Sequence, residues 1–456
     1  MCSLEGLRTW ILLIAAQHFL CSYTFASVEF ARSNCARSFL SNTTANRRDW
    51  RLNHSLQKSL LFNCRRKMTQ QVLILGGSGR IGSRVAADLL QHTLATVVIA
   101  GRNLEAGKRA LRMLHSIEDT FVQRCCFVPI DLENWSELQT AIAQSDLVIH
   151  CAGAFHHRNA SVLKFCIDAG VNYVDVSDHP SFTCKAIALK SKAESAGITA
   201  IVNTGIFPGI SNSMVRRDIE QLDQADKVHL SYVVGGSGGA GLTVMRSTFL
   251  GLQRPFEAWI NGKREKIKPY SKREVIHFPH YGKVGVYWFD MPESFTVADT
   301  FPVRTVVTKF GSVPRFYNYL TWSVARSWHP RLLQSKTVIE FLSRVSFAMT
   351  RISDRFSGVG VAIHSEVIGW KYGQPVRCRS TLYHPNTAQA AGIGTGTIAQ
   401  LLLSGALKCP GVWTPEQALT TPMFETAMQS RGIEIQQALF SNPLSHPSET
   451  SFAALC

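Results

Sequence analysis

One strand–glycine–helix pattern constrains the fold of this 456-residue chain more than any other feature. The aliphatic run Gln71–Leu75 is typical of a strand buried on both faces. It leads into three spaced glycines, and residues 81–90 then carry apolar side chains at helical spacing. Such glycines allow a tight turn, a close approach of a pyrophosphate to backbone N–H groups and close packing of helix on strand. The pattern predicts a dinucleotide-binding turn, with contacts from Gly76, Ser78, Gly79, Arg80, Ile81 and Gly82.

The end of the next expected strand indicates which dinucleotide binds. The strand Thr96–Ala100 runs into Gly101 and Arg102, where an NAD enzyme usually carries Asp or Glu for the ribose 2′-hydroxyl. A guanidinium at Arg102 suits a 2′-phosphate instead, because it can bind it through two hydrogen bonds. We therefore expect NADP(H), in preference to NAD.

Further strands and helices alternate up to residue 205, which predicts a Rossmann-type, doubly wound parallel sheet. Strands are expected at 125–130, 147–150 and 172–178. Residues at two of their ends add expected cofactor contacts: Asp131 beside the adenine, and Cys151, Ala152 and Gly153 beside the nicotinamide. The sequence contains no Y-x-x-x-K pair, so short-chain dehydrogenases that use this pair are a poor fit.

Six segments in order along the chain resemble the saccharopine dehydrogenase family, in its bacterial and plastid-type branch. They are Val72–Gly82, Cys151–Gly153, Tyr173–Asp178, Gly205–Asn212, Gly235–Gly241 and Gly411–Glu416. The resemblance covers roughly residues 70–435, and it implies a Rossmann domain, a second α/β domain with a mixed sheet, and C-terminal helices that return to the first domain. The expected division is a targeting segment at 1–67, the NADP-binding domain at 68–205, the substrate domain at 206–386, the C-terminal helices at 387–440 and a tail at 441–456. Gly392, Gly394 and Gly396 weaken the start of the first of these helices and are expected to permit close backbone packing.

The resemblance also implies hydride transfer between NADP(H) or NAD and the C–N bond of an amino-acid adduct or a related small substrate. Such chemistry needs one proton donor, and the candidates are Asp178, His156 and Tyr173, with His179 beside them; none has a motif behind it. The family's glycine-rich segments suggest a substrate cleft near Pro208, Gly209, Gly238 and Gly239. A substrate with several carboxylates would need basic residues, for which Arg246, Arg254, Arg304 and Lys309 are available. The substrate itself stays unassigned.

The first 67 residues have the composition of a targeting signal. Trp10–Cys21 is a short apolar run behind Arg8, as in a signal peptide, and Phe30–Lys67 carries nine basic residues and one acid, as in an organelle transit peptide. Together they predict import into a plastid, with a mitochondrion or the secretory path as alternatives. The remaining chain has no block of five like charges, so a nucleic-acid partner is not expected. The twelve cysteines lack C-x-x-C spacing, so no metal site is expected either.

The stretch Phe316–Phe356 is rich in apolar and aromatic residues but is interrupted by basic side chains, including Arg326 and Arg344. No apolar run after residue 70 is long enough for an integral membrane span, so we expect buried helices here, with a peripheral membrane contact as the alternative. Three functions remain open: an NADP(H)-dependent oxidoreductase acting on a small metabolite, an NADP(H)-sensing regulatory protein without catalysis, and a membrane-apposed, lipid-related reductase. The sequence also allows a homodimer.

Overall fold

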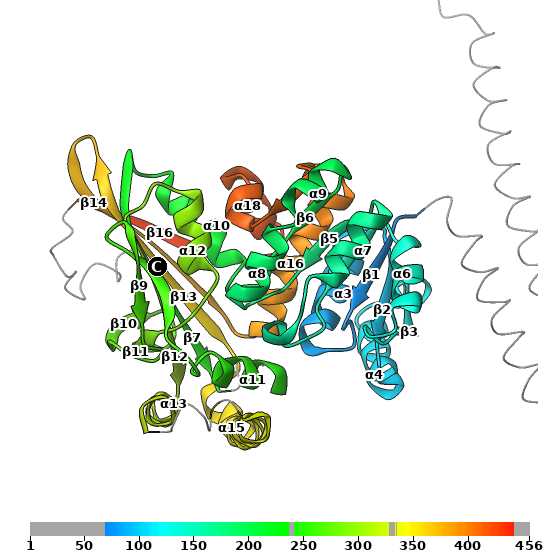
Figure 1. Cartoon of the computed structure of the whole chain (residues 1–456), viewed down its shortest axis with the longest axis horizontal. Helices are drawn as coiled ribbons and strands as arrows, with labels where there is room; N and C mark the ends of the chain where they lie inside the picture. Colours follow the sequence, from blue (N-terminus) through cyan, green and yellow to red (C-terminus); the bar gives the residue numbers. More distant parts are fainter. Residues whose placement is uncertain (1–68, 237–240, 328–332, 334, 442–456) are drawn as a thin grey trace, which may run out of the picture. The chain divides into compact units, whose positions relative to one another are not determined.

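The computed structural model describes residues 69–236, 241–327, 333 and 335–441 (Figure 1). The predicted targeting segment, the tail after residue 441 and the two predicted cleft residues Gly238 and Gly239 lie outside this part of the chain.

The first domain is built on a seven-stranded parallel sheet in the order β15-β6-β5-β4-β1-β2-β3. Its strands are β1 (Gln71–Leu75), β2 (Thr96–Gly101), β3 (Cys125–Pro129), β4 (Leu147–His150), β5 (Asn172–Asp175), β6 (Thr199–Ile201) and β15 (Gly411–Trp413). The helices between them are α3 (Arg80–His92), α4 (Leu104–His115), α5 (Phe121–Arg124), α6 (Trp135–Ala143), the 3-10 helix η1 (Phe155–His157), α7 (Ser161–Ala169), α8 (Pro180–Ile187) and α9 (Lys190–Ser195). The prediction of a doubly wound Rossmann-type sheet is confirmed.

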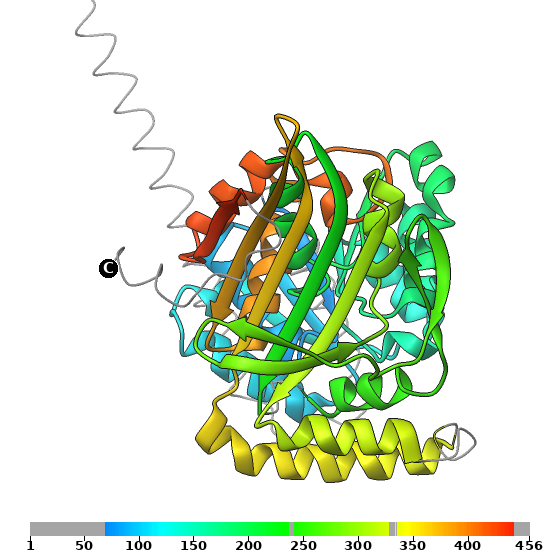
Figure 2. The same cartoon turned by 90° about the vertical axis from the view of Figure 1, so that its left-hand side faces the viewer.

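A mixed sheet forms the second domain, in the order β10-β11-β12-β7-β13-β14-β16 (Figure 2). Only β7 and β12 pair in parallel in it, whereas the other neighbours are antiparallel. Its strands are β7 (Gln224–Gly235), β10 (Glu274–Phe278), β11 (Gly282–Trp288), β12 (Thr305–Val313), β13 (Val361–Lys371), β14 (Gln374–His384) and β16 (Ile435–Phe440). The helices α10 (Ile210–Ile219) and α12 (Glu293–Thr300) pack on β13 and β12, and a separate hairpin pairs β8 (Phe256–Ile260) with β9 (Lys263–Ile267). The predicted second α/β domain with a mixed sheet is thereby confirmed.

After the second sheet the chain returns to the first domain through α16 (Thr387–Leu403), which packs along α3. The contact depends on small residues: a Cβ atom on Gly392 would lie 2.6 Å from the Cβ of Arg84. The predicted role of these glycines in close packing is confirmed. Residues 387–440 are not only helices, however. Besides α17 (Pro415–Ala418) and α18 (Thr421–Gln429), they form β15 in the first sheet and β16 in the second.

The apolar stretch after residue 315 forms two surface helices, α13 (Phe316–Ser327) and α15 (Lys336–Ser357), which lie side by side along one edge of the second domain (Figure 2). The prediction of buried helices is wrong, because only their inner sides pack, on β12 and on α11 (Leu242–Leu250). Their outer sides leave large apolar residues exposed. Within the described ranges, no helix is long and apolar enough to cross a membrane.

Candidate functional site

The glycine turn between β1 and α3 requires glycine at two positions for different reasons. Gly76 has a φ of 77°, and a Cβ atom there would lie 2.8 Å from the backbone of Ala152. A Cβ atom on Gly82 would lie 2.4 Å from the carbonyl oxygen of Gly76. The first glycine therefore lets the turn pass close to the loop after β4, and the second lets α3 start directly against the turn.

The start of α3 is suited to an anion. Its N-cap residue is Gly79, no side chain caps it, and its first turn contains no acidic residue. The first N–H groups of the helix and its positive dipole end are therefore available to a pyrophosphate. Ile81, at the same end, packs against the hydrophobic cores of both domains. These features fit the dinucleotide predicted from the sequence.

The end of β2 carries the residues expected near the ribose phosphate. A Cβ atom on Gly101 would lie 2.8 Å from the Oγ of Ser78, so Ser78 lies beside this strand end. Arg102 is exposed and makes no ion pair or side-chain hydrogen bond with any described residue. Asp131, also exposed, follows β3, and its Oδ1 accepts a hydrogen bond only from the N–H of Glu133, at 3.2 Å. Arg102 and Asp131 therefore remain available to a ligand.

The loop Cys151–Gly153 is held in place by a hydrogen bond from a buried histidine. The Nε2 of His150 lies 3.1 Å from the carbonyl oxygen of Ala152, and its Nδ1 lies 3.1 Å from the hydroxyl of Tyr173. Burial lowers the pKa of His150 to about 3, so the ring is neutral. Since a carbonyl only accepts, Nε2 carries the proton and Nδ1 accepts from the hydroxyl. Tyr173 is fully buried, so this proton-donor candidate does not face a cavity; its contacts are those of a residue that positions the loop.

A cavity of about 510 Å³ lies between the two domains. The first domain contributes His156 from η1 and His179 from the start of α8. The second domain contributes residues from α11, the β8–β9 hairpin, α12 and the loops between them. Its charged lining residues are Arg254, Glu257, Arg264, Asp290 and Asp299.

His156 and His179 form a pair whose protonation can be deduced from its contacts. The N–H of Ser181 donates to Nδ1 of His179 at 3.2 Å, so this nitrogen has no proton. His179 then carries its proton on Nε2, which lies 2.7 Å from Nδ1 of His156. His156 accepts there and is left with an N–H on Nε2. Burial lowers the pKa of both rings, that of His179 to about 4, so the pair is neutral and His156 is a hydrogen-bond donor.

Two carboxyl groups near the domain interface have pKa values close to neutrality. Burial raises the pKa of Asp178 to about 6, although a hydrogen bond from Ser247 lowers it. Burial alone raises the pKa of Asp290 to about 7, and no ion pair or side-chain hydrogen bond links it to another described residue. Asp178 was expected from the sequence, but it does not line the cavity. Asp290 and Arg264 were not expected, because they follow no motif and reach the cavity only through the tertiary fold.

Several other predicted residues lie elsewhere. Pro208 and Gly209 are buried, and a Cβ atom on Gly209 would lie 2.1 Å from the carbonyl oxygen of Gly205. They therefore shape the connection to the second domain and do not line the cavity. Of the four basic candidates, Arg254 alone lines it. The others are paired, Arg246 with Glu340, Arg304 with Asp226 and Lys309 with Glu274.

The described part of the chain contains no cluster of three or more His, Cys, Asp or Glu residues that could hold a metal ion.

Comparisons with known proteins agree with this geometry. Residues 72–201 match the family model of the saccharopine dehydrogenase NADP binding domain. Carboxynorspermidine synthase of Vibrio cholerae serotype O1 is 24% identical over 400 residues, which is 78% of this chain and 94% of the relative. An NADP(+), L-glutamate-forming saccharopine dehydrogenase of Pyricularia oryzae is 29% identical over 170 residues, 37% of this chain and 34% of that protein. The solved structure of an L-Glu-forming saccharopine dehydrogenase from Saccharomyces cerevisiae has a TM-score of 0.57 at 15% identity, and covers 81% of this chain and all of the other.

Proposed function

The chain belongs to the saccharopine dehydrogenase family of NADP-binding, oxidoreductase-like proteins, and from this premise we propose that it is an NADP(H)-dependent oxidoreductase acting on the C–N bond of a carboxylated amine. The observation that carries the proposal is the interdomain cavity. The pair of His156 and His179 lines this cavity, beside the loop expected to contact the nicotinamide, and so do charged side chains of both signs that form no ion pair with another described residue. Its volume of about 510 Å³ suits a small metabolite.

The cavity has an acidic and a basic side. Arg254 forms no ion pair within the described chain, which leaves its guanidinium available to a carboxylate. The raised pKa of Asp290 has burial as its only cause, so no cation lies close enough to stabilise its charge. An ammonium group would supply that cation. A substrate that has both a carboxylate and an amine would bind Arg254 through the carboxylate and Asp290 through the ammonium group.

A relative that spans most of this chain supports the same class of substrate. The name carboxynorspermidine denotes a polyamine with a carboxyl group, and that relative is named as its synthase. The identity of 24% supports the class of compound and not this particular product.

Catalysis is assigned to few groups. NADP(H), when bound, donates or accepts the hydride. The glycine turn and the start of α3 would hold its pyrophosphate, and the loop supported by His150 would position its nicotinamide half. His156 lines the cavity, and its Nε2–H orients the substrate by donating a hydrogen bond. Asp178, with its pKa of about 6, does not line the cavity and is assigned no proton transfer.

A screen for NADPH oxidation tests the proposal. The purified protein is mixed with aldehydes that carry a carboxylate, together with diamines, and absorbance of NADPH is followed. We expect consumption only when both partners are present, and a strong loss in Arg254→Gln compared with the matched control Arg304→Gln. Tight NADPH binding without turnover of any pair would instead support an NADP(H) sensor.

The location of the protein is a separate proposal. We propose import into a plastid, supported by the apolar run Trp10–Cys21 and the acid-poor segment Phe30–Lys67. Residues 1–67 fused to a fluorescent protein should accumulate in plastids. Fluorescence confined to mitochondria or to the secretory path would favour one of the alternatives.

A further inference from the structure

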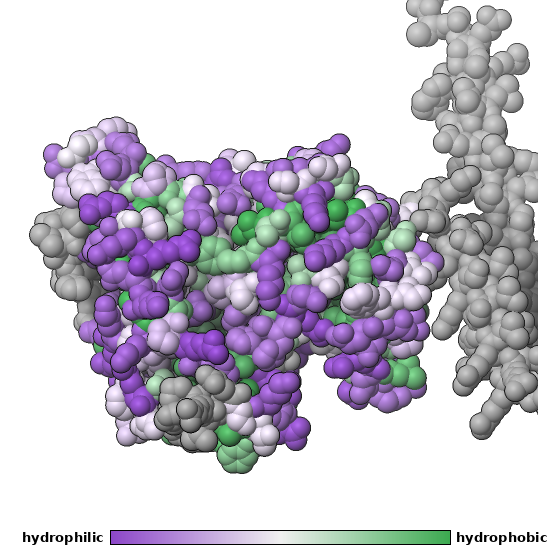
Figure 3. All heavy atoms as spheres, in the orientation of Figure 1, coloured by the Kyte–Doolittle hydropathy of each residue, from purple (hydrophilic) through white to green (hydrophobic). Residues whose placement is uncertain are grey.

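The helices α13 and α15 expose large apolar side chains on their outer sides. On α15 the exposed residues Phe341, Val345, Ile352 and Phe356 lie four, seven and four positions apart, so they form one stripe along the helix. Phe356 is 87% exposed, Ile352 69% and Phe341 63%. On α13, exposed Phe316, Tyr319, Leu320 and Trp322 continue the apolar surface. Hydrophobic side chains reach the lower edge of the molecule beneath these helices (Figure 3). A surface patch of this kind indicates a contact with something apolar.

Basic residues flank the stripe. The described residues of the two helices and their approach contain six of them, Arg315, Arg326, Lys336, Arg344, Arg351 and Arg355, against the acids Glu340 and Asp354. Glu340 is bound by Arg246 and Arg344. The outward charge is therefore positive. Apolar residues with Trp and Tyr beside Lys and Arg are the composition of a helix that lies in the interface of an anionic membrane.

A cavity next to the same surface provides a second observation. A cavity of about 350 Å³ beside α13 is lined by Arg273 and Arg315, together with Tyr287, Tyr319 and Trp322. Neither arginine has a carboxylate partner among the described residues, and Arg315 donates one hydrogen bond, to the carbonyl oxygen of Lys283 at 2.8 Å. Two such guanidinium groups suit a phosphate. Because Tyr319 and Trp322 belong to both the cavity and the exposed surface, the cavity opens where lipid headgroups would lie.

The inner side of the helical pair is firmly attached. Arg246 of α11 binds Glu340 of α15 through two hydrogen bonds, of 2.7 and 2.9 Å. The guanidinium of Arg80, the first residue of α3, lies 5.7 Å from the ring centre of Phe347 on α15. The exposed apolar stripe therefore lies on a helix whose inner side is already packed against the rest of the protein.

We propose that the outer surface of α13 and α15 docks on an anionic phospholipid leaflet, with Arg273 and Arg315 binding a lipid phosphate. Docking is peripheral: the apolar stripe enters the headgroup region and the basic side chains face the lipid phosphates. It is independent of the reaction proposed for the interdomain cavity, which opens between other elements.

Amide hydrogen exchange of the full chain, with and without vesicles, tests this directly. The vesicles contain phosphatidylcholine alone or phosphatidylcholine with phosphatidylglycerol. We expect slower exchange in peptides from residues 316–327 and 336–357, only with the anionic vesicles. Because the readout is local, binding through the apolar run at Trp10–Cys21 cannot mimic it. Unchanged exchange in both helices, or equal protection by neutral vesicles, would overturn the proposal.

Vesicle flotation of variants supplies the second arm. The triple variant Phe341→Ser, Ile352→Ser, Phe356→Ser should bind anionic vesicles at least about tenfold more weakly. A matched control, Leu94→Ser, Val122→Ser, Tyr372→Ser, changes three exposed apolar residues elsewhere and should bind as the wild type does. Arg273→Gln with Arg315→Gln should also weaken binding, whereas Arg304→Gln with Lys263→Gln should not. All variants should retain NADPH binding, which checks the fold. If the wild type is a dimer by light scattering and the triple variant is a monomer, the surface is an interface between copies and the proposal is wrong.

Discussion

At the scale of single residues, the guanidinium of Arg102 is available to bind a ligand. It follows β2 directly, beside Ser78 and the glycine turn, and forms no ion pair in the described part of the chain. Residues 72–201 match an NADP binding domain, and the sequence predicts that Arg102 binds the 2′-phosphate of NADP(H). Its contribution should therefore depend on which dinucleotide is present.

Replacing Arg102 by alanine should weaken NADPH binding about 10- to 100-fold, because a charge-assisted hydrogen bond contributes about 1.5–3 kcal/mol. NADH binding should stay the same, since NADH lacks the phosphate. Fluorescence titration with both dinucleotides measures this, and Arg109→Ala, which removes an exposed arginine from α4, is the control. An equal loss of affinity for both dinucleotides would remove the role assigned to Arg102.

Asp290 gives the cavity a pH dependence whose sign follows from its pKa. Burial raises this pKa from 3.8 to about 7, so the carboxyl is neutral below that pH and ionised above it. Only the ionised form attracts an ammonium group. For an amine substrate, KM should rise up to about tenfold per pH unit as the pH falls below 7.

Asp290→Asn should raise KM at pH 8 and abolish this component of the pH profile, while NADPH affinity is unchanged. Steady-state kinetics between pH 5.5 and 8.5, roughly the range around that pKa, would show the effect. Asp119→Asn, an exposed acid far along the chain from the cavity residues, should keep the wild-type profile. A profile that persists in Asp290→Asn would assign the titration to another group, first of all Asp178.

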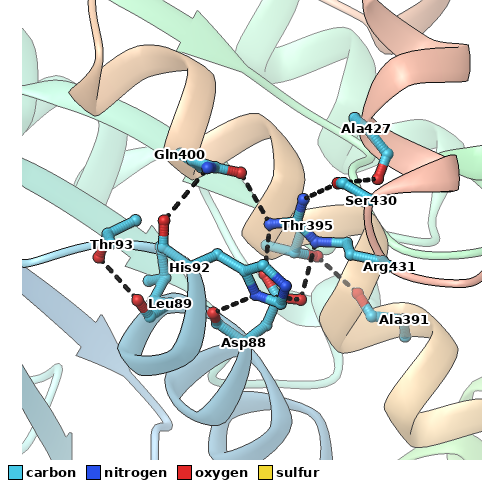
Figure 4. Close-up of polar contacts among 10 residues, drawn as sticks. All are labelled: Asp88, Leu89, His92, Thr93, Ala391, Thr395, Gln400, Ala427, Ser430 and Arg431. Atoms are coloured by element: carbon cyan, nitrogen blue, oxygen red, sulfur yellow. Dashed lines mark hydrogen bonds and ion pairs between the residues drawn. The ribbon is translucent and has the colours of Figure 1, made fainter.

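At the scale of elements, the packing of α16 on α3 is tied to a buried ion pair (Figure 4). Arg431, which follows α18, donates to both carboxylate oxygens of Asp88 on α3, at 2.9 and 2.8 Å, and to Gln400 of α16 at 3.0 Å. A Cβ atom on Gly396 would lie 2.1 Å from the Oδ2 of Asp88, so the glycine makes room for the carboxylate. One guanidinium thus links three elements.

Arg431→Leu should lower the free energy of unfolding by about 3–5 kcal/mol, because it leaves a buried carboxylate without its partner. Urea unfolding followed by circular dichroism measures the loss. Adding Asp88→Asn should recover part of it, since the uncompensated charge is then gone. The exposed pair of Arg304 and Asp226 provides the comparison, and Arg304→Ala should cost less than about 1 kcal/mol. Similar losses in both arginine variants would contradict a special role for the buried pair.

The success of sequence-based prediction varied with how locally each element is determined. Strands β1 and β4 could be predicted to the residue, because each contains an aliphatic run typical of a sheet buried on both faces. β15 could not, because its three residues are extended only through pairing with β6, more than 200 positions earlier. The outer surfaces of α13 and α15 were misjudged because apolar composition suggests burial when no partner is known.

The same distinction holds for the site. The glycine turn and Arg102 are close in sequence, and a motif with a physical basis connects them. Asp290, Arg264 and His179 come from three separate segments, so only the fold shows that they share a cavity. Tyr173 lay in a recognisable strand, but its burial depends on neighbours from other segments.

At the scale of the whole described chain, the two domains are joined by repeated crossings. The chain passes from β6 into the second domain through α10, returns through α16, completes the first sheet with β15 and ends in the second sheet with β16. Neither sheet can be assembled from one continuous segment. Loss of the second domain would also remove α16 and β15 from the first.

This topology predicts a single cooperative unfolding transition, although each of the two seven-stranded sheets packs against its own large hydrophobic core. In scanning calorimetry of the full chain, the calorimetric enthalpy should equal the van't Hoff enthalpy. NADPH at about 100 times its Kd should stabilise the folded state by about 2.7 kcal/mol and shift the whole transition, although its contacts lie mainly in the first domain. If two transitions were seen and NADPH shifted only one of them, the domains would unfold separately. The passages of the chain between the domains would then connect the two sheets without coupling their stability.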